Sequence, residues 1–113
     1  MISIHPVEDS RISDTLARFE GADEIALSVF VSEFPQGDGP PLHIHPYAEI
    51  FLIESGSVAF TVEAEETEVT RVEAGNFVIV PADTRHKFVG VGDEVNRVVS
   101  IHPSARVVQE NLE

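Results

Sequence analysis

The chain has 113 residues, the length of one domain, and at this size about two thirds of the unfolded surface can be buried on folding. Seven lysines and arginines stand against twenty aspartates and glutamates, which gives a formal net charge of −13 at pH 7. A charge of this sign repels the phosphates of nucleic acids and of anionic membranes, so we expect neither as a partner.

The sequence also lacks features of secreted and membrane-bound proteins. It has no cysteine, which excludes disulfides, thiolate metal ligands and cysteine nucleophiles. No charged start followed by an apolar run marks a signal peptide, and no apolar stretch is long enough to span a bilayer. We therefore expect a soluble, cytoplasmic protein.

Residues 1–22 are predicted to form an N-terminal arm. Ile2 and Ile4 alternate with polar residues, a pattern typical of a short edge strand, and Pro6 ends it. Residues 14–19 are compatible with a helical turn that stops before residue 21. His5, next to this edge strand, is expected at the surface.

The middle of the chain alternates apolar segments with turn residues. Alternation predicts a strand over residues 25–34, with Phe30 and Phe34 on the face that carries the serines, so both faces need cover from another sheet or a second subunit. The continuous apolar runs 50–53 and 77–80 are typical of strands buried on both faces.

Further short strands are predicted between glycine and proline turns, over residues 58–63, 69–72, 86–91 and 95–101. About eight short strands at this spacing indicate an all-β sandwich or barrel. We place this barrel at residues 23–103 and treat residues 104–113 as a C-terminal extension, either a short helix or an arm.

The strongest chemical signal lies in residues 37–56. His43 and His45 are two residues apart, so in an extended strand both imidazoles project from the same face, and Glu49 can join them if the chain turns back. Imidazole and carboxylate suit first-row transition metals, although a single histidine in a strand is more often a hydrogen-bonded polar residue. Residues 74–90 add a third imidazole, His86, on a separate strand.

Together these two stretches resemble the two sequence motifs of the cupin superfamily. The marked positions of the first motif are Gly37, His43, His45, Glu49 and Gly56, and those of the second are Gly75, Pro81 and His86. The second motif departs from the family at Asp83, usually glycine, and at Gly90, usually asparagine. Aspartate tolerates a left-handed turn, so Asp83 is a mild departure. What replaces the asparagine at position 90 stays open.

The resemblance implies a double-stranded β-helix, the jelly-roll barrel of small single-domain cupins. In that fold both motifs face the barrel interior, so His43, His45, Glu49 and His86 would surround one divalent transition metal ion. The ligand set does not distinguish Fe, Mn, Ni, Cu, Co and Zn. Since ligating histidines must be neutral, we expect metal to be lost below about pH 6, near the reference imidazole pKa of about 6.5.

The same resemblance suggests a pocket beside the metal. Its expected lining is Tyr47, Phe51, Phe60 and Phe88. We expect a small-molecule ligand there, and the first hypothesis is a metal-dependent dioxygenase that acts on a small, largely apolar, oxygen-chelating compound. No catalytic residue is assigned, because no general base is evident unless Glu49 leaves the metal. The alternative is a non-catalytic binding or sensing module in which the metal holds a ligand or stiffens the barrel.

Two further expectations concern the rest of the chain. His102 follows the end of a strand and precedes a proline, which favours a structural role. The apolar strands need cover on their outer faces, and small cupins, which this chain resembles, often pair through such faces and through exchanged terminal strands. We therefore expect a homodimer.

Overall fold

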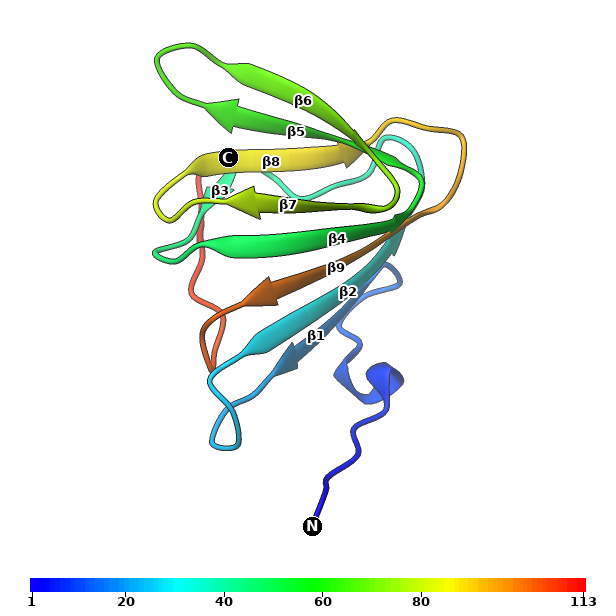
Figure 1. The fold of residues 1–113 in the computed structure, drawn as a ribbon, viewed down its shortest axis with the longest axis vertical. Helices are drawn as coiled ribbons and strands as arrows, with labels where there is room; N and C mark the ends of the chain where they lie inside the picture. The colour runs from blue at the N-terminus through cyan, green and yellow to red at the C-terminus, as the bar shows by residue number, and fades with distance from the viewer.

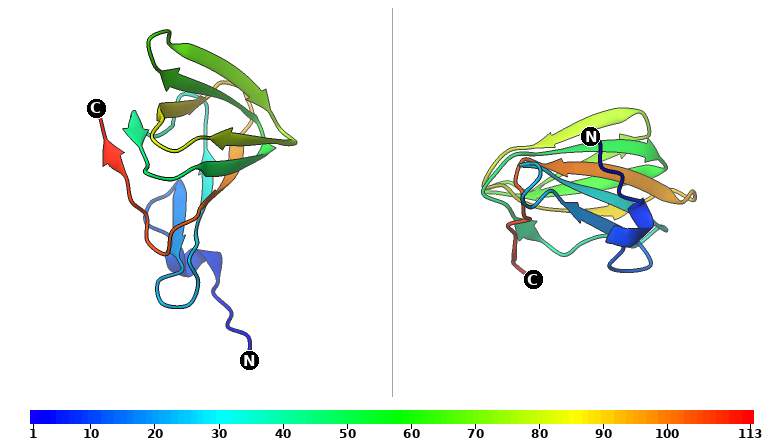
Figure 2. Two further views of the ribbon diagram at one scale, coloured as in Figure 1. Left: turned by 60° about the vertical axis from the view of Figure 1, so that its left-hand side comes forward. Right: turned by 90° about the horizontal axis from the view of Figure 1, so that it is seen from below.

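A computed structural model describes residues 1–113 and shows two antiparallel sheets of five strands each, packed as a jelly-roll barrel (Figures 1 and 2). The first sheet consists, in spatial order, of β1 (Leu16–Glu20), β2 (Ser28–Phe34), β9 (Asn96–His102), β4 (Glu49–Ser55) and β7 (Asn76–Val80). The second consists of β10 (Glu110–Asn111), β3 (His43–Ile44), β8 (Arg85–Gly90), β5 (Ser57–Glu63) and β6 (Glu68–Glu73). One short 3-10 helix, η1 (Val7–Ser10), precedes β1. The all-β prediction and the jelly-roll barrel are confirmed.

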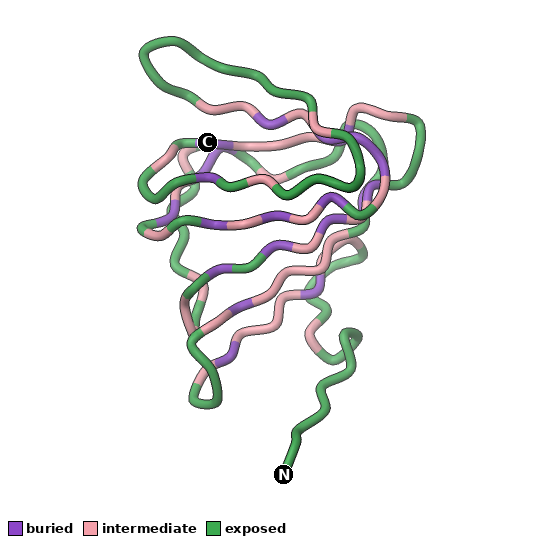
Figure 3. The backbone as a smooth tube through the Cα atoms, viewed as in Figure 1, coloured by how far each residue is buried: buried purple, intermediate pink, exposed green.

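The alternation of buried and exposed residues decides which side of each strand faces the interior. Along β4, Glu49, Phe51 and Ile53 are buried, whereas the residues between them are half-buried (Figure 3). The apolar core lies between the sheets and is made of Phe34, Phe51, Ile53, Val58, Phe60, Val80 and Val98. Interior residues of β4 thus supply both the core and, at the start of the strand, a buried carboxylate.

The N-terminal region differs from the prediction. Residues 2–4 form no strand and extend away from the barrel, exposed to solvent (Figure 1). Residues 16–20, expected within a helical turn or arm, instead form β1, which pairs with β2 through Ala17 opposite Val31 and Phe19 opposite Val29. Sheet pairing supplies hydrogen bonds and apolar contacts that a single helical turn lacks, which explains the difference.

The C-terminal segment is extended and lies along the barrel rather than forming a helix (Figure 2). Its start is fixed by a hydrogen bond from the backbone N–H of Ala22 to the carbonyl oxygen of Ala105. Its end pairs with β3, with Glu110 opposite Ile44 and Asn111 opposite His43. The last ten residues therefore cover the side of the barrel that carries the first motif.

The two departures from the second cupin motif both have a structural explanation. Asp83 has a φ of 58°, so an aspartate occupies the left-handed turn conformation, as predicted. At Gly90, an added Cβ would lie 2.2 Å from Nδ2 of Asn96. Position 90 thus has no room for a side chain, because the amide of Asn96 on β9 occupies that space; Asn96 is fully buried and donates to the carbonyl oxygen of Phe34.

The structure contains no helix with the length and hydrophobicity that a membrane crossing requires.

Candidate metal centre

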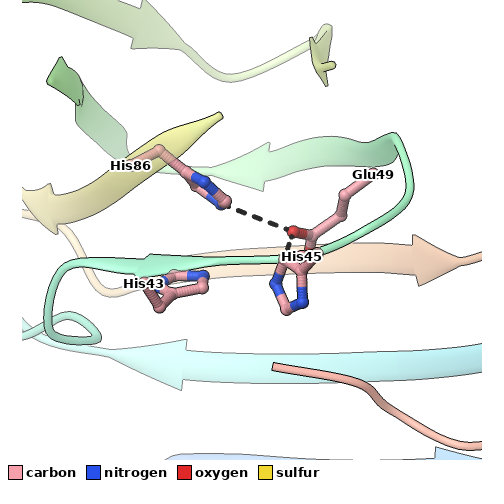
Figure 4. Close-up of side chains that lie close together, drawn as sticks. All are labelled: His43, His45, Glu49 and His86. Carbon is pink, nitrogen blue, oxygen red and sulfur yellow. Dashed lines mark ion pairs between the residues drawn. The ribbon is translucent and has the colours of Figure 1, made fainter. Parts of the chain in front are cut away.

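Four buried side chains converge at one end of the barrel interior (Figure 4). His43 lies on β3 directly opposite His86 on β8, and His45 and Glu49 flank the turn that joins β3 to β4. The potential ligand atoms of these four residues lie within 4.8 Å of one another. The structure therefore brings together all the residues that the sequence predicts as ligands.

The three imidazoles are oriented by backbone carbonyl groups. Nδ1 of His43 lies 2.7 Å from the carbonyl oxygen of Pro41, and Nδ1 of His86 lies 2.8 Å from that of Thr84. Nδ1 of His45 lies 2.8 Å from the carbonyl oxygen of Val108 in the C-terminal segment. A carbonyl oxygen only accepts hydrogen bonds, so each Nδ1 carries the proton and each Nε2 keeps a free lone pair for a metal.

Glu49 is the negative charge at the centre of this cluster. Its Oε1 lies 3.3 Å from Nε2 of His45 and 3.6 Å from Nε2 of His86 (Figure 4). Burial alone would raise the pKa of Glu49. The contact with His102, and those with His45 and His86 when their Nε2 atoms carry a proton, outweigh burial and hold the pKa well below its usual range. Glu49 is therefore ionised, as a metal ligand must be.

The histidines respond to the same environment in opposite directions. Burial lowers the pKa of His43 to about 4. Burial also opposes protonation of His45, but its contacts with Glu49 and Val108 prevail and raise its pKa. His43 is thus neutral, as a metal ligand must be. At His45, a metal ion must compete with a proton for the imidazole nitrogen.

The donor set fits a divalent metal ion. Nε2 of His45, Nε2 of His86 and Oε1 of Glu49 are buried and have no hydrogen-bond partner. Such groups are costly to leave unsatisfied, and a single cation between them would satisfy all three. Nitrogen and oxygen donors of this kind suit a first-row transition metal, so these residues can hold the ion that the resemblance implies.

A cavity of about 630 Å³ opens beside the cluster. It is lined by 22 residues, of which 7 are hydrophobic, so it is more polar than the sequence suggests. Phe51 and Phe88 belong to its lining, together with Phe30. Phe60 lies in the apolar core, with its ring centroid 5.1 Å from that of Phe51. Tyr47 is outside the lining and stacks on His45.

His102 is a site residue that the sequence analysis did not identify. It is fully buried at the end of β9, and its Nε2 lies 2.9 Å from Oε2 of Glu49. The signal was the two-residue period of the strand: Val98 and Ser100 line the cavity, so the residue two positions further also faces inward. The interpretation of His102 as merely structural did not use this period.

The pKa of His43 leads to a prediction for the metal-free protein. The pKa of His43 is 6.5 as an ordinary imidazole and about 4 in the folded protein. Between these two pH values, the unfolded chain binds a proton on His43 that the folded chain does not. The contribution of His43 to stability is therefore present above this window and is lost as pH falls through it. His45, with its raised pKa, acts in the opposite direction, so the two must be separated by mutation.

We expect the free energy of unfolding of wild type to fall towards that of His43→Asn as pH decreases from about 7 to about 4.5. Urea denaturation in the presence of a chelator measures this difference at each pH. A difference that stays constant across the window would show that burial does not depress protonation of His43.

The comparisons with known proteins agree with the fold and the site. Residues 30–102 match the family model of the cupin domain. An uncharacterized protein of Streptomyces coelicolor is 29% identical over 97 residues, which cover 86% of this chain and 90% of that protein. These matches concern the part of the chain that contains both motifs.

Solved structures with a similar fold include two enzymes that act on oxalate. Oxalate decarboxylase from Bacillus subtilis, solved at pH 4.6, superposes with a TM-score of 0.81 at 19% identity, over 94% of this chain and 30% of the decarboxylase. Oxalate oxidase superposes with a TM-score of 0.75 at 19% identity, over 86% of this chain and 54% of the oxidase. The chain thus spans only part of either enzyme, and at this identity the likeness concerns the fold.

The fold, the buried cluster of three histidines and one glutamate, and the family match define a small cupin. The chain belongs to the cupin domain family, whose model matches residues 30–102.

Proposed function

We propose that the protein binds one divalent transition metal ion through His43, His45, Glu49 and His86 and uses it to hold a small oxygen-chelating molecule in the barrel. The observation that carries this proposal is the set of three buried, unpartnered donor atoms beside a cavity of about 630 Å³. A cavity of this size accommodates a small organic molecule.

The proposed activity is a dioxygenase-like oxidation. A bound metal supplies Lewis acidity and redox chemistry to an oxygen-chelating ligand. The aromatic side chains of Phe51 and Phe88 offer contacts for an apolar part of that ligand, and Ser32 and Ser100 offer hydroxyl groups. Two related observations support a chelating ligand: oxalate oxidase has been solved with glycolate, and Bacillus subtilis oxalate decarboxylase has Mn(II) centers.

A non-catalytic binding or sensing role is the second candidate. Outside the four proposed ligands, the ionisable side chains that line the cavity are Arg18, Asp38 and His102. This small set limits proton transfer to a substrate, which favours binding over catalysis.

Metal analysis of freshly purified protein, followed by aerobic turnover assays of the metal-loaded protein, tests these candidates. Catechols, flavonols and diketones represent chelating compounds with apolar parts, and oxalate and glycolate represent small acids. Oxygen consumption with any compound of the first group supports the dioxygenase. Tight binding without turnover supports the binding module, and purified protein that neither contains nor takes up metal contradicts both.

We also propose that the protein forms a homodimer through the outer face of the first sheet. Strand register places two apolar rows across this face: Ala17, Val31, Val99, Leu52 and Phe77 in one, and Phe19, Val29, Ile101, Ile50 and Ile79 in the other. Ala17 is already buried within the chain, so the surface left to cover is formed by the other members of the rows. No charged residue interrupts the rows, although the chain carries a net charge of −13. A second copy can cover this face without bringing like charges into contact across the apolar area.

The region of β7 is the most exposed part of this face, because Phe77 and Ile79 are 71% and 67% exposed. We expect wild type to sediment at twice the chain mass at micromolar concentration and Ile79→Lys to sediment as a monomer. Val69→Lys is the matched control, since Val69 is 64% exposed on β6 of the other sheet. A monomeric wild type, or equal effects of both substitutions, would contradict this interface.

A further inference from the structure

Behind the proposed ligands, Tyr47 and His102 form a chain of polar contacts that leads to Glu49. The hydroxyl oxygen of Tyr47 lies 2.7 Å from Nδ1 of His102, and Nε2 of His102 lies 2.9 Å from Oε2 of Glu49. His102 is fully buried, and Glu49 is 4% exposed. Neither Tyr47 nor His102 belongs to the set of converging ligand atoms.

The hydrogen bonds of Tyr47 determine which nitrogen of His102 carries the proton. The backbone N–H of Val108 donates to the hydroxyl oxygen of Tyr47 at 3.2 Å. The hydroxyl proton must then go to another acceptor, and the one other partner of this hydroxyl is Nδ1 of His102. An ordinary tyrosine hydroxyl, with a reference pKa of about 10, keeps its proton near neutral pH. Nδ1 of His102 is therefore an acceptor, and its proton lies on Nε2.

This protonation is the reverse of that at the other three histidines of the site. His43, His45 and His86 direct Nδ1 at backbone carbonyl oxygens, so their Nε2 atoms are free to bind a metal. Nδ1 of His102 faces a hydroxyl group instead, so its Nε2 carries a hydrogen and cannot bind a metal. The ring of His102 packs against that of Phe30 in a tilted arrangement, with ring centroids 4.4 Å apart.

The two oxygens of Glu49 face different partners. Oε1 points towards His45 and His86, where a metal would lie, and Oε2 points towards His102. The N–H of His102 is at hydrogen-bond distance from Oε2 without being aligned on it. The last torsion of a glutamate is soft, so rotation of the carboxylate allows Oε2 to align with this N–H in a charge-assisted hydrogen bond.

We propose that His102, held in its Nε2–H form by Tyr47, is a positioning residue that fixes Oε2 of Glu49 so that only Oε1 is offered to the metal. With one oxygen from Glu49 and three imidazoles as ligands, a bound metal would keep capacity for a chelating ligand from the adjacent cavity. The role of His102 in metal binding rests on the proposed function. The assignment of the His102 tautomer does not depend on a metal.

The tautomers are measured on the metal-free protein by nitrogen-15 NMR of the imidazole rings at about pH 8, where free histidine is neutral. We expect an Nε2–H form for His102 and Nδ1–H forms for His43 and His86. Tyr47→Phe removes the hydroxyl donor and is expected to shift the His102 signals towards a mixture of the two forms. An Nδ1–H or doubly protonated His102 in wild type would overturn the proposal.

Cobalt(II) titration, followed by the visible spectrum, tests the effect on the metal. We expect His102→Asn to weaken cobalt binding about 10- to 100-fold and to change the spectrum, as is typical of residues that orient ligands. His102→Gln places an amide N–H near the position of Nε2 and is expected to restore much of the affinity. His5→Asn, far from the site, is the control and should bind cobalt as wild type does.

Two results of this titration would overturn the proposal. One is wild-type affinity and an unchanged spectrum in His102→Asn. The other is complete loss of cobalt in both His102 variants, which would make His102 a ligand. If wild type binds no cobalt, the proposed function fails, and the tautomer measurement still decides the role of Tyr47 and His102.

Discussion

Replacing His86 by alanine is expected to remove nearly all bound metal from the protein. His86 is 1% exposed, faces His43 across the β3–β8 pair, and has its Nε2 3.6 Å from Oε1 of Glu49, so its removal takes one imidazole out of the proposed ligand set. Loss of an outer residue that orients a ligand weakens metal binding about 10- to 100-fold, and loss of the ligand itself should exceed that range. Metal content after dialysis, and cobalt affinity by titration, measure the effect.

The same measurement needs variants that separate metal loss from unfolding. His86→Gln keeps a polar side chain of similar size and removes the imidazole, so it should fold and still lose the metal. His5→Ala is the matched histidine control, since its imidazole is exposed and contacts Ser3 and Glu24 at the surface. Full metal occupancy in a folded His86→Gln would mean that the ion, if present, lies elsewhere.

The metal cluster illustrates what a sequence pattern can predict. The two-residue spacing of His43 and His45 is a local property, and strand geometry turns it directly into two imidazoles on one face. That His86 lies opposite His43 depends on the pairing of β3 with β8, which joins residues 43 positions apart. Only the resemblance to the two cupin motifs predicted this proximity, because periodicity carries no information on strand order.

The pocket residues show where the prediction was less complete. Strand alternation places Phe51, Phe60 and Phe88 on inward faces, and all three point into the barrel. Alternation does not say how far along the barrel axis a side chain lies, and Phe60 lies in the core, away from the cavity. The period of β9 indicates that His102 faces inward, but its contact with Glu49 also depends on the register between β9 and β4, which the sequence alone does not determine.

Removing the side-chain amide of Asn96 is expected to be among the most destabilising single changes in the barrel. Asn96 is fully buried; its Oδ1 accepts the backbone N–H of Ser57 at 2.9 Å, and its Nδ2 donates to the carbonyl oxygen of Phe34 at 3.1 Å. Asn96→Ala removes both of these buried hydrogen bonds, and a buried backbone group left without a partner costs about 1–3 kcal/mol. We expect a loss of at least about 2 kcal/mol in urea denaturation, equivalent to about 10 °C in Tm.

A double-mutant cycle with Gly90 tests whether this amide takes the place of the asparagine side chain usual at position 90. An added Cβ at Gly90 would lie 2.2 Å from Nδ2 of Asn96, so Gly90→Ala should destabilise wild type by displacing the amide. In Asn96→Ala the amide is absent, so the same Gly90→Ala change should cost much less, and the two effects should be strongly non-additive. Gly75→Ala is the control: it strains a backbone with a φ of 90°, an added Cβ there meets nothing within 4 Å, and its cost should add to that of Asn96→Ala independently. Additive effects of Gly90→Ala and Asn96→Ala would show that the two positions do not share one space in the folded protein.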